Sequence, residues 1–211
     1  MRAPLSRAVI IDACLVLIER NGADAFSMRL LGTHLEVDPT AMYRHFRNKD
    51  ELLRAVGDRI HASVLVDLPA RGGWRRIVRE ICIRLRAAHL AHPELASLVR
   101  TGPPMHNNEF ALTEAMLHQL RRGGLKPRDA TLAYHALIEL TVASAAIDAP
   151  LAAKSVAERS ATYRLWRAAY ASLDPELYPE SVALAAHLYA TSADDRFAYA
   201  LDCLLAGIQP A

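Results

Sequence analysis

Hydrogen-bond donors are concentrated between residues 40 and 47, where a threonine, a tyrosine, a histidine and two arginines occur together. At about 100° per residue, Met42 and Phe46 fall on one side of a helix and the polar side chains fall on the other. Guanidinium, phenol, imidazole and hydroxyl groups can bond to phosphates and to the edges of bases. The spacing therefore predicts a short helix that is anchored by its apolar side and presents its polar side to nucleic acid.

A preceding helix and a tight turn must position this segment. Ser27 suits the N-cap of a helix that ends near Leu35, and residues 36–37 then form a turn. Asp38 suits the N-cap of the second helix, with Pro39 at its first position, where the missing N–H and fixed φ do no harm. Two short helices with a basic second member are the helix-turn-helix pattern, whose second helix enters the major groove of DNA.

The surface predicted to contact DNA extends beyond this second helix, the reading helix, which we expect to span about residues 39–46. Asn48 suits the N-cap of the next helix. Lys49 begins that helix, where a phosphate could meet both an ammonium group and a helix N-terminus, and a solvated lysine is the alternative. The predicted DNA-binding residues are Ser27, Met28, Arg29, Pro39, Thr40, Ala41, Tyr43, Arg44, His45 and Lys49.

The composition predicts an all-α fold. The 211 residues are 52% hydrophobic, which is ample for a buried core, and they are rich in alanine, leucine and arginine. The net charge of +2 is too small to indicate nucleic-acid binding unless a local basic surface exists. Cys14, Cys82 and Cys203 are far apart in apolar helical contexts, so we expect a reducing cytosol and neither a disulfide framework nor a zinc site.

Two other classes of function compete with DNA binding. An enzyme is disfavoured because the sequence has no G-x-S-x-G elbow, P-loop, dinucleotide fingerprint or H-E-x-x-H motif, so no catalytic residue or cofactor is predicted. A helical protein-interaction module stays open if the outward face of residues 40–47 contacts protein instead of phosphate. The salt dependence of binding distinguishes these classes. The affinity of a protein for DNA falls steeply as the salt concentration rises, because binding releases counterions from the phosphates.

Four spaced motifs lie between about Ser6 and Ile60: M-R-x-L at 28–31, L-x-V at 35–37, Y-R-H-F at 43–46 and N-K-D-E-L-L at 48–53. With these motifs the run resembles the DNA-binding segment of the TetR (tetracycline-repressor) family. The resemblance implies a three-helix DNA-binding domain over residues 1–50 and a larger helical effector-binding and dimerisation domain over residues 51–211. Such sequences usually carry glycine where this chain has Glu36, and a left-handed residue other than glycine costs roughly 1 kcal/mol.

Two apolar helices are expected to form a dimer interface. Residues 127–148 are apolar nearly all round and residues 193–208 are similarly apolar, so each lies in the centre of a fold or against another chain. In the family that the chain resembles, two C-terminal helices of each subunit form a four-helix interface, and the alternative is that both helices line a monomer core. A two-fold dimer places two reading helices about 34 Å apart and so requires a palindromic operator. The candidate interface residues are Ile138, Val142, Ala145, Phe197, Leu201, Leu204 and Ile208.

Scattered polar and aromatic residues in the C-terminal part suit a pocket for a small-molecule effector, although such residues at helical spacing are more often core. His89 and His92 have a possible metal spacing but lack a third ligand, so no metal is predicted. The histidine that binds the drug-chelated metal in the tetracycline repressor falls on Val99 here, which argues against magnesium–tetracycline as the effector. The ligand candidates are His89, His92, Met105, His106, Phe110, Met116, Trp166 and Tyr170, with His118 beside them.

The helix expected over residues 154–173 carries Tyr163, Trp166 and Tyr170 on one face. It could be a flap over the pocket, an arm on a partner subunit or ordinary packing. The most apolar run, 130–153, is interrupted by polar side chains, so we expect a cytoplasmic protein without a membrane span. These observations predict a dimeric regulator of transcription, with repression of palindromic operators and release by a small-molecule effector as the favoured mode.

Overall fold

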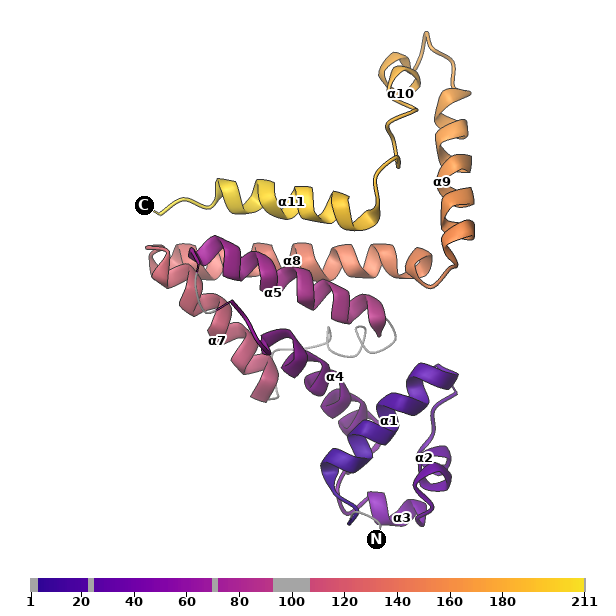
Figure 1. Ribbon diagram of the computed structural model, residues 1–211, viewed down its shortest axis with the longest axis vertical. Coiled ribbons are helices and arrows are strands. Elements are labelled where there is room, and N and C mark those ends of the chain that lie inside the picture. Colours follow the sequence, from indigo (N-terminus) through magenta and orange to yellow (C-terminus); the bar gives the residue numbers. More distant parts are fainter. Residues whose placement is uncertain (1–3, 23–24, 70–71, 93–106, 211) are drawn as a thin grey trace.

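The structure is a computed structural model that describes residues 4–22, 25–69, 72–92 and 107–210 (Figure 1). The regular elements in these ranges are all helices, which confirms the predicted all-α fold. The expected helix at 93–100 and the loop at 101–104 lie outside the described residues. The helices are α1 (Arg7–Asn21), α2 (Met28–Leu35), α3 (Pro39–Met42), α4 (Lys49–Leu65), α5 (Trp74–Ala91), α7 (Asn107–Arg122), α8 (Pro127–Ala152), α9 (Val156–Ala171), α10 (Pro179–Ala183) and α11 (Ala193–Gly207).

Side-chain caps begin the helices of the N-terminal part. The Ser27 hydroxyl accepts a hydrogen bond from the Leu30 backbone N–H at 3.1 Å, and the Asn48 side chain accepts one from the Glu51 N–H at 2.8 Å. Asp38 caps α3, as its position before Pro39 predicts. These bonds satisfy N–H groups that have no partner inside the helix, which is why the helix starts could be predicted from local sequence.

Two hydrophobic cores divide the molecule. The head core is formed by α1, α2, α3 and the first part of α4, and it ends at Ile60. The body core begins at Val64 and continues through α5, α7, α8 and α11. Because α4 contributes to both, it connects the head at one end of the molecule to the body (Figure 1). The functional boundary expected near residue 50 stays a prediction.

The central helix of the body, α5, contacts α4, α7, α8 and α11. Its Arg86 is buried and bonds to side chains of two other helices: Asp148 of α8 at 2.6 Å, Asp194 of α11 at 2.5 Å and Ser144 at 3.0 Å. The guanidinium also lies 4.9 Å from the Phe197 ring centre. A buried cation is tolerated only when its donors are satisfied, so this network holds α5, α8 and α11 in one arrangement.

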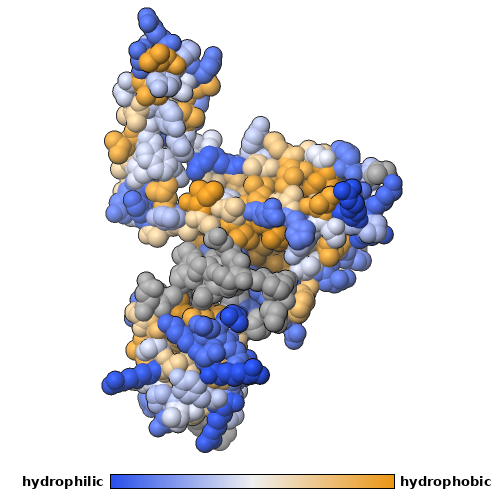
Figure 2. Space-filling view, turned by 180° about the vertical axis from the view of Figure 1, so that it is seen from behind, coloured by the Kyte–Doolittle hydropathy of each residue, from blue (hydrophilic) through white to orange (hydrophobic). Residues whose placement is uncertain are grey.

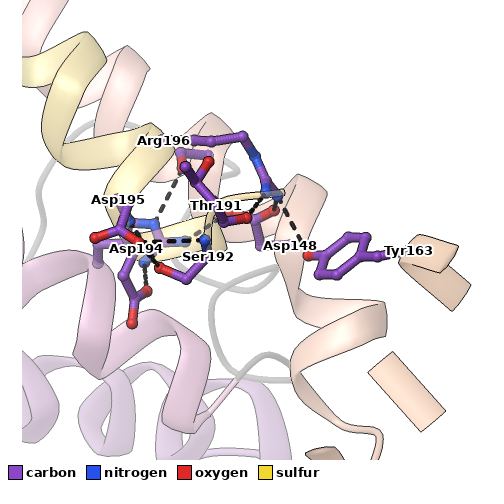
Figure 3. A network of polar contacts seen from close by, with 9 residues as sticks. Asp148, Tyr163, Thr191, Ser192, Asp194, Asp195 and Arg196 are labelled. Atoms are coloured by element: carbon purple, nitrogen blue, oxygen red, sulfur yellow. Dashed lines mark hydrogen bonds and ion pairs between the residues drawn. The ribbon is translucent and has the colours of Figure 1, made fainter. Parts of the chain in front are cut away.

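An arm formed by α9 and α10 projects from the body (Figure 1). None of the residues of α9 is buried, so this helix has little packing of its own. At its base, Arg196 donates to the Tyr163 hydroxyl at 3.2 Å and to the Thr191 carbonyl at 2.8 Å (Figure 3). The three aromatic residues predicted to share a face of α9 gather around Tyr189, whose ring centre is 4.8 Å from that of Trp166.

Helix α8 is longer than expected and runs past Pro150 to Ala152. Proline lacks a backbone donor, so α8 loses one intrahelical hydrogen bond at Pro150 near its C-terminal end. Within the described residues, α8 is also the one helix long and apolar enough to cross a membrane by length and composition, with 28% of that stretch buried. It packs against α5, α7 and α11, so it is a helix of the body with one uncovered side.

Candidate nucleic-acid interface

The turn between α2 and α3 contains the expected left-handed residue. Glu36 has φ 52° and ψ 44°, and the Val37 N–H donates to the Gly32 carbonyl at 3.0 Å. This conformation in a residue other than glycine costs roughly 1 kcal/mol, as the sequence predicts. Gly32 faces the turn closely, since a Cβ there would lie 3.0 Å from Pro39 Cγ and 3.1 Å from the Val37 oxygen. Position 32 therefore leaves no room for a side chain between α2 and the start of α3.

The α-helical part of the reading helix is shorter than expected. It spans Pro39–Met42, whereas the prediction placed it over about residues 39–46. Residues 43–45 continue as tighter turns, in which the Tyr43 N–H donates to the Thr40 carbonyl and the His45 N–H to the Met42 carbonyl. Hydrogen bonds from an N–H to the carbonyl three residues earlier, as in a 3₁₀-helix, are common where a short helix ends.

Asp38 holds the start of α3. Its Oδ1 atom accepts hydrogen bonds from the Thr40 N–H at 2.7 Å and the Thr40 hydroxyl at 2.6 Å. These bonds favour the charged form and lower the pKa of the Asp38 carboxyl. Asp38 is therefore an ionised cap that fixes the first turn of the reading helix.

The two faces of the reading segment are arranged as predicted from the helical spacing. Met42 and Phe46 are 0% and 1% exposed in the head core, whereas Tyr43 is 53% exposed. Thr40 and Arg44 are also exposed, and His45 is half-buried. Arg29 on α2 and Arg47 after the turn add two exposed guanidinium groups to this end of the head. The outward face therefore offers donors of the kind that bases and phosphates accept.

Two of the predicted DNA-binding residues make contacts within the head. Met28 is buried in the head core, so only its backbone N–H at the start of α2 can reach a phosphate. The Lys49 ammonium donates to the Phe26 carbonyl at 2.7 Å and lies 5.4 Å from the Phe26 ring centre, and the residue is half-buried at the start of α4. The side-chain contact predicted for Met28 is therefore corrected, whereas the phosphate contact predicted for Lys49 stays a prediction.

Arg7, at the start of α1, was missed by sequence reasoning. Its guanidinium donates to the His45 carbonyl and lies 4.0 Å from the Phe46 ring centre. It is 38 positions away from His45, so no local pattern could reveal this contact.

The predicted ligand residues that the structure describes lie on α5 and its end, on α7 and on the arm. His89 is buried in α5, Met116 is buried in the body core, and Phe110 is 54% exposed on α7. Trp166 and Tyr170 belong to the aromatic group on the arm. His92 follows the end of α5 and His118 is exposed, while Met105, His106 and Val99 lie outside the described residues.

His61 of α4 is a second residue that the sequence did not reveal. Its ring stacks on that of His89 with the centres 5.8 Å apart, and its Nδ1 atom is 3.9 Å from a Glu109 carboxylate oxygen. Burial lowers the pKa of His61, while the carboxylates of Glu109 and Asp58 act in the opposite direction. Among the described residues, no three or more histidine, cysteine or acidic side chains lie together in a way that could hold a metal ion.

The predicted dimer residues divide into two sets. Ala145, Phe197 and Leu201 are buried in the chain's own core, so their assignment to an interface is corrected. Ile138, Val142, Leu204 and Ile208 are partly exposed at its edge. The uncovered apolar surface instead includes Leu132 and Ile147 of α8, at 56% and 75% exposure, and Tyr199 of α11 at 74%. Figure 2 shows hydrophobic residues gathered on the body.

The sequence matches two family descriptions that together cover most of the chain. Residues 10–56 match the bacterial regulatory proteins of the tetR family, and residues 68–211 match the tetracyclin repressor-like C-terminal domain. The chain belongs to the TetR family. Members of this family are DNA-binding regulators of transcription and not enzymes, so the competing prediction of an enzyme is set aside and the prediction of a DNA-binding regulator is confirmed.

Solved TetR-family structures resemble the whole chain. Apo ActR from Streptomyces coelicolor is 29% identical, with a TM-score of 0.85 over 99% of this chain and 96% of that one. ActR in complex with actinorhodin is 30% identical, with a TM-score of 0.85 over 98% of this chain and 97% of that one. The arrangement of head, body and arm is therefore shared with a solved TetR-family regulator.

Curated relatives match over different lengths. An HTH-type transcriptional regulator of Saccharopolyspora erythraea is 28% identical over 66% of this chain, and the match spans 59% of that relative. An HTH-type transcriptional repressor of Mycobacterium tuberculosis is 27% identical over 97% of this chain and 80% of its own length. The class D tetracycline repressor of Escherichia coli is 30% identical over 66% of this chain and 65% of its own length.

Proposed function

We propose that this TetR-family regulator acts as a cytoplasmic homodimer that represses transcription from a palindromic operator and is released by a small-molecule effector. The main observation in support of a dimer is the uncovered apolar side of α8. Leu132 and Ile147 are more than half exposed there, and Ala143 and Ala146 between them are exposed and small. A long apolar helix that its own chain leaves partly uncovered is stabilised by contact with another chain.

A two-fold axis through this surface explains the need for two heads. The α-helical part of the reading helix is four residues long, so one head contacts only a few base pairs. Two heads related by symmetry, about 34 Å apart, bind two half-sites one DNA turn apart and so select a palindrome. We assign base and phosphate contacts to Arg29, Thr40, Tyr43, Arg44 and His45, with Ser27, Pro39 and Ala41 at the edge of the contact.

Effector release is supported by the relatives. ActR was solved in complex with actinorhodin, and the mycobacterial protein that matches 97% of this chain is a repressor. We place the effector site of this chain in the body, beside α4, because only a ligand that contacts α4 or its neighbours can move the heads directly. The buried His61 and His89 lie at this junction, where α4 crosses α5 and α7.

The experiment that tests the proposal is selection of DNA sites from a random-sequence library with the purified protein. We expect an enriched palindrome that is bound by a dimer, with an affinity that falls steeply as salt increases. Sedimentation of the protein–DNA complex gives the number of chains on each site. An asymmetric site occupied by one chain would contradict the dimer, and failure to enrich any sequence would contradict the operator.

A further inference from the structure

The end of the reading helix is held by two side chains from outside it, Arg7 of α1 and Glu51 of α4. The Arg7 guanidinium lies over the Phe46 ring at 4.0 Å and donates to the His45 carbonyl. The same guanidinium reaches the Glu51 Oε1 atom, with N–O distances of 3.3 and 3.4 Å. The other oxygen of the carboxylate, Oε2, accepts a hydrogen bond from the Arg47 backbone N–H at 2.8 Å.

These contacts bracket Phe46 from both sides. The carbonyl before it is bound by Arg7, and the amide after it is bound by Glu51. The hydrogen bonds of Glu51 favour its charged form and lower the pKa of its carboxyl, with the Arg47 N–H as the largest cause. One carboxylate oxygen thus binds the backbone of Arg47, and the other binds the Arg7 guanidinium that holds the His45 carbonyl.

The reading helix needs such support because it cannot hold its own shape. A helix of four residues is far below the length that is stable in water, and residues 43–45 already depart from α-helical bonding. The buried Phe46 ring anchors one point of the segment. A single anchor leaves the backbone free to rotate about it, whereas bonds on either side of the anchor remove that freedom.

We infer that Arg7 and Glu51 form a clamp that positions the reading residues Tyr43, Arg44 and His45 for sequence-specific DNA binding. Neither residue reads a base. The clamp makes the orientation of the reading face depend on α1 and α4, and its loss lowers the preference for the operator over other DNA. This inference rests on the DNA-contacting face proposed above.

A competing role for Arg7 is a direct phosphate contact, because its side chain is 49% exposed. The two roles predict opposite effects of removing Glu51. If Glu51 only places a negative charge near DNA, the Glu51→Ala variant binds DNA more tightly. If Glu51 is half of a clamp, the same variant binds its operator more weakly despite the favourable change in charge.

Asp50 supplies a matched control. It lies in the same first turn of α4, it is exposed, and among the described residues its carboxylate has no hydrogen bond or ion pair. The Asp50→Ala substitution therefore changes the charge equally and leaves the clamp intact. The probe is the duplex that the wild-type protein enriches from a random-sequence library, compared with a scrambled duplex of equal length.

We expect Glu51→Ala to weaken binding to the enriched duplex about tenfold, with little change on the scrambled duplex, while Asp50→Ala binds both at least as tightly as wild type. Arg7→Lys, which keeps the charge but loses the planar fork, should lose specificity in the same way. Arg7→Ala combined with Glu51→Ala should cost little more than either change alone, because both break one unit.

Several outcomes would overturn the clamp. The first is that Glu51→Ala binds both duplexes as Asp50→Ala does, and the second is that Arg7→Lys keeps wild-type specificity. The third is that Arg7→Ala weakens binding to both duplexes equally and lowers the slope of log affinity against log salt concentration by about 1, as loss of a phosphate contact predicts. Circular dichroism of each variant at the binding temperature shows whether the head is folded. If Glu51→Ala unfolds it, Arg7→Lys still decides between the two roles. Failure of the wild-type protein to enrich any duplex would refute the proposed function instead.

Discussion

The Asp58 carboxylate on α4 caps the start of α7 by accepting a hydrogen bond from the Asn108 backbone N–H at 2.9 Å. The same oxygen accepts from the Glu109 N–H at 3.1 Å, and the other oxygen accepts from the Asn108 side-chain amide at 2.8 Å. A cap that belongs to a different helix joins the two elements, since α7 loses its N-terminal acceptor if α4 moves away. This bond links the helix that leaves the head to a helix of the body.

Removal of this cap should destabilise the body. We expect Asp58→Ala to lower the free energy of unfolding by about 1–2 kcal/mol, because two backbone donors lose their acceptor. Asp58→Asn keeps one acceptor oxygen and should fall between the alanine variant and wild type. Denaturant unfolding measures both, and equal stability of all three proteins would show that the cap contributes nothing.

The outward side chains of the reading segment should carry the affinity for the operator. We expect Tyr43→Ala and Arg44→Ala each to weaken operator binding by about 1–3 kcal/mol without changing dimerisation. Arg164→Ala on the arm is a matched control, because it removes an exposed arginine that lies far along the chain from the head. Fluorescence anisotropy with the selected duplex measures the affinities, and wild-type affinity in either head variant would remove that residue from the DNA-contacting face.

Gly32 should be intolerant of a side chain. A Cβ at this position would meet the Pro39 ring at 3.0 Å and the Val37 backbone oxygen at 3.1 Å, so the turn must shift to admit it. We expect Gly32→Ala to lower the free energy of unfolding by about 1–3 kcal/mol and to weaken operator binding. Gly207→Ala, also in a helix but with open space around its Cβ, should be neutral or stabilising. Thermal unfolding of the two variants distinguishes crowding from a general effect of alanine.

The outer side of α8 should be needed for the dimer. Leu132→Arg places a charge on the uncovered surface, and we expect it to weaken dimerisation by about 2–4 kcal/mol and to lower operator affinity with it, while the chain stays folded. Val66→Arg, a similarly exposed position after α4, should leave the dimer intact. Sedimentation measures the dissociation constant. A Leu132→Arg protein that remains a tight dimer would place the interface elsewhere.

Burial of His61 should make stability depend on pH. Because burial lowers the pKa of the folded state below the ordinary value of 6.5, the unfolded chain takes up a proton first as the pH falls. The unfolded state then binds more protons, so the free energy of unfolding decreases as the pH falls through the range just below that value. We expect His61→Gln to reduce this decrease, measured by denaturant unfolding at about pH 7.5 and about pH 5.5. An unchanged pH dependence would show that His61 does not contribute.

The helix-turn-helix unit could be predicted from sequence because its determinants are local. Ser27, Asp38 and Asn48 cap helices through N–H groups two or three residues away, and the apolar spacing of Met42 and Phe46 selects the buried face. Prediction failed where the backbone tightens after Met42 and where the Met28 side chain enters the head core. Those outcomes depend on the neighbouring chain and not on helical spacing.

The body shows more clearly what the periodic spacing of apolar residues cannot predict. In a helix that is apolar all round, the sequence does not show which side its own chain covers. Ala145, Phe197 and Leu201 could therefore be assigned to the chain's own core only once α5, α8 and α11 were placed together. The effector candidates stay a prediction, and helical spacing could not place those that the structure describes relative to one another. Residues of similar chemistry were distributed among a core, an exposed helix face and an arm.

By itself, the sequence determined the all-α class, the helix-turn-helix and the family, because each depends on residue types at short, regular spacings. Tertiary structure alone decided that Arg7 and Glu51 meet at the end of the reading helix, that Asp58 caps α7, and that His61 lies against His89. These contacts join residues that are tens of positions apart, and such contacts form only when the packing of the two cores brings separate helices together.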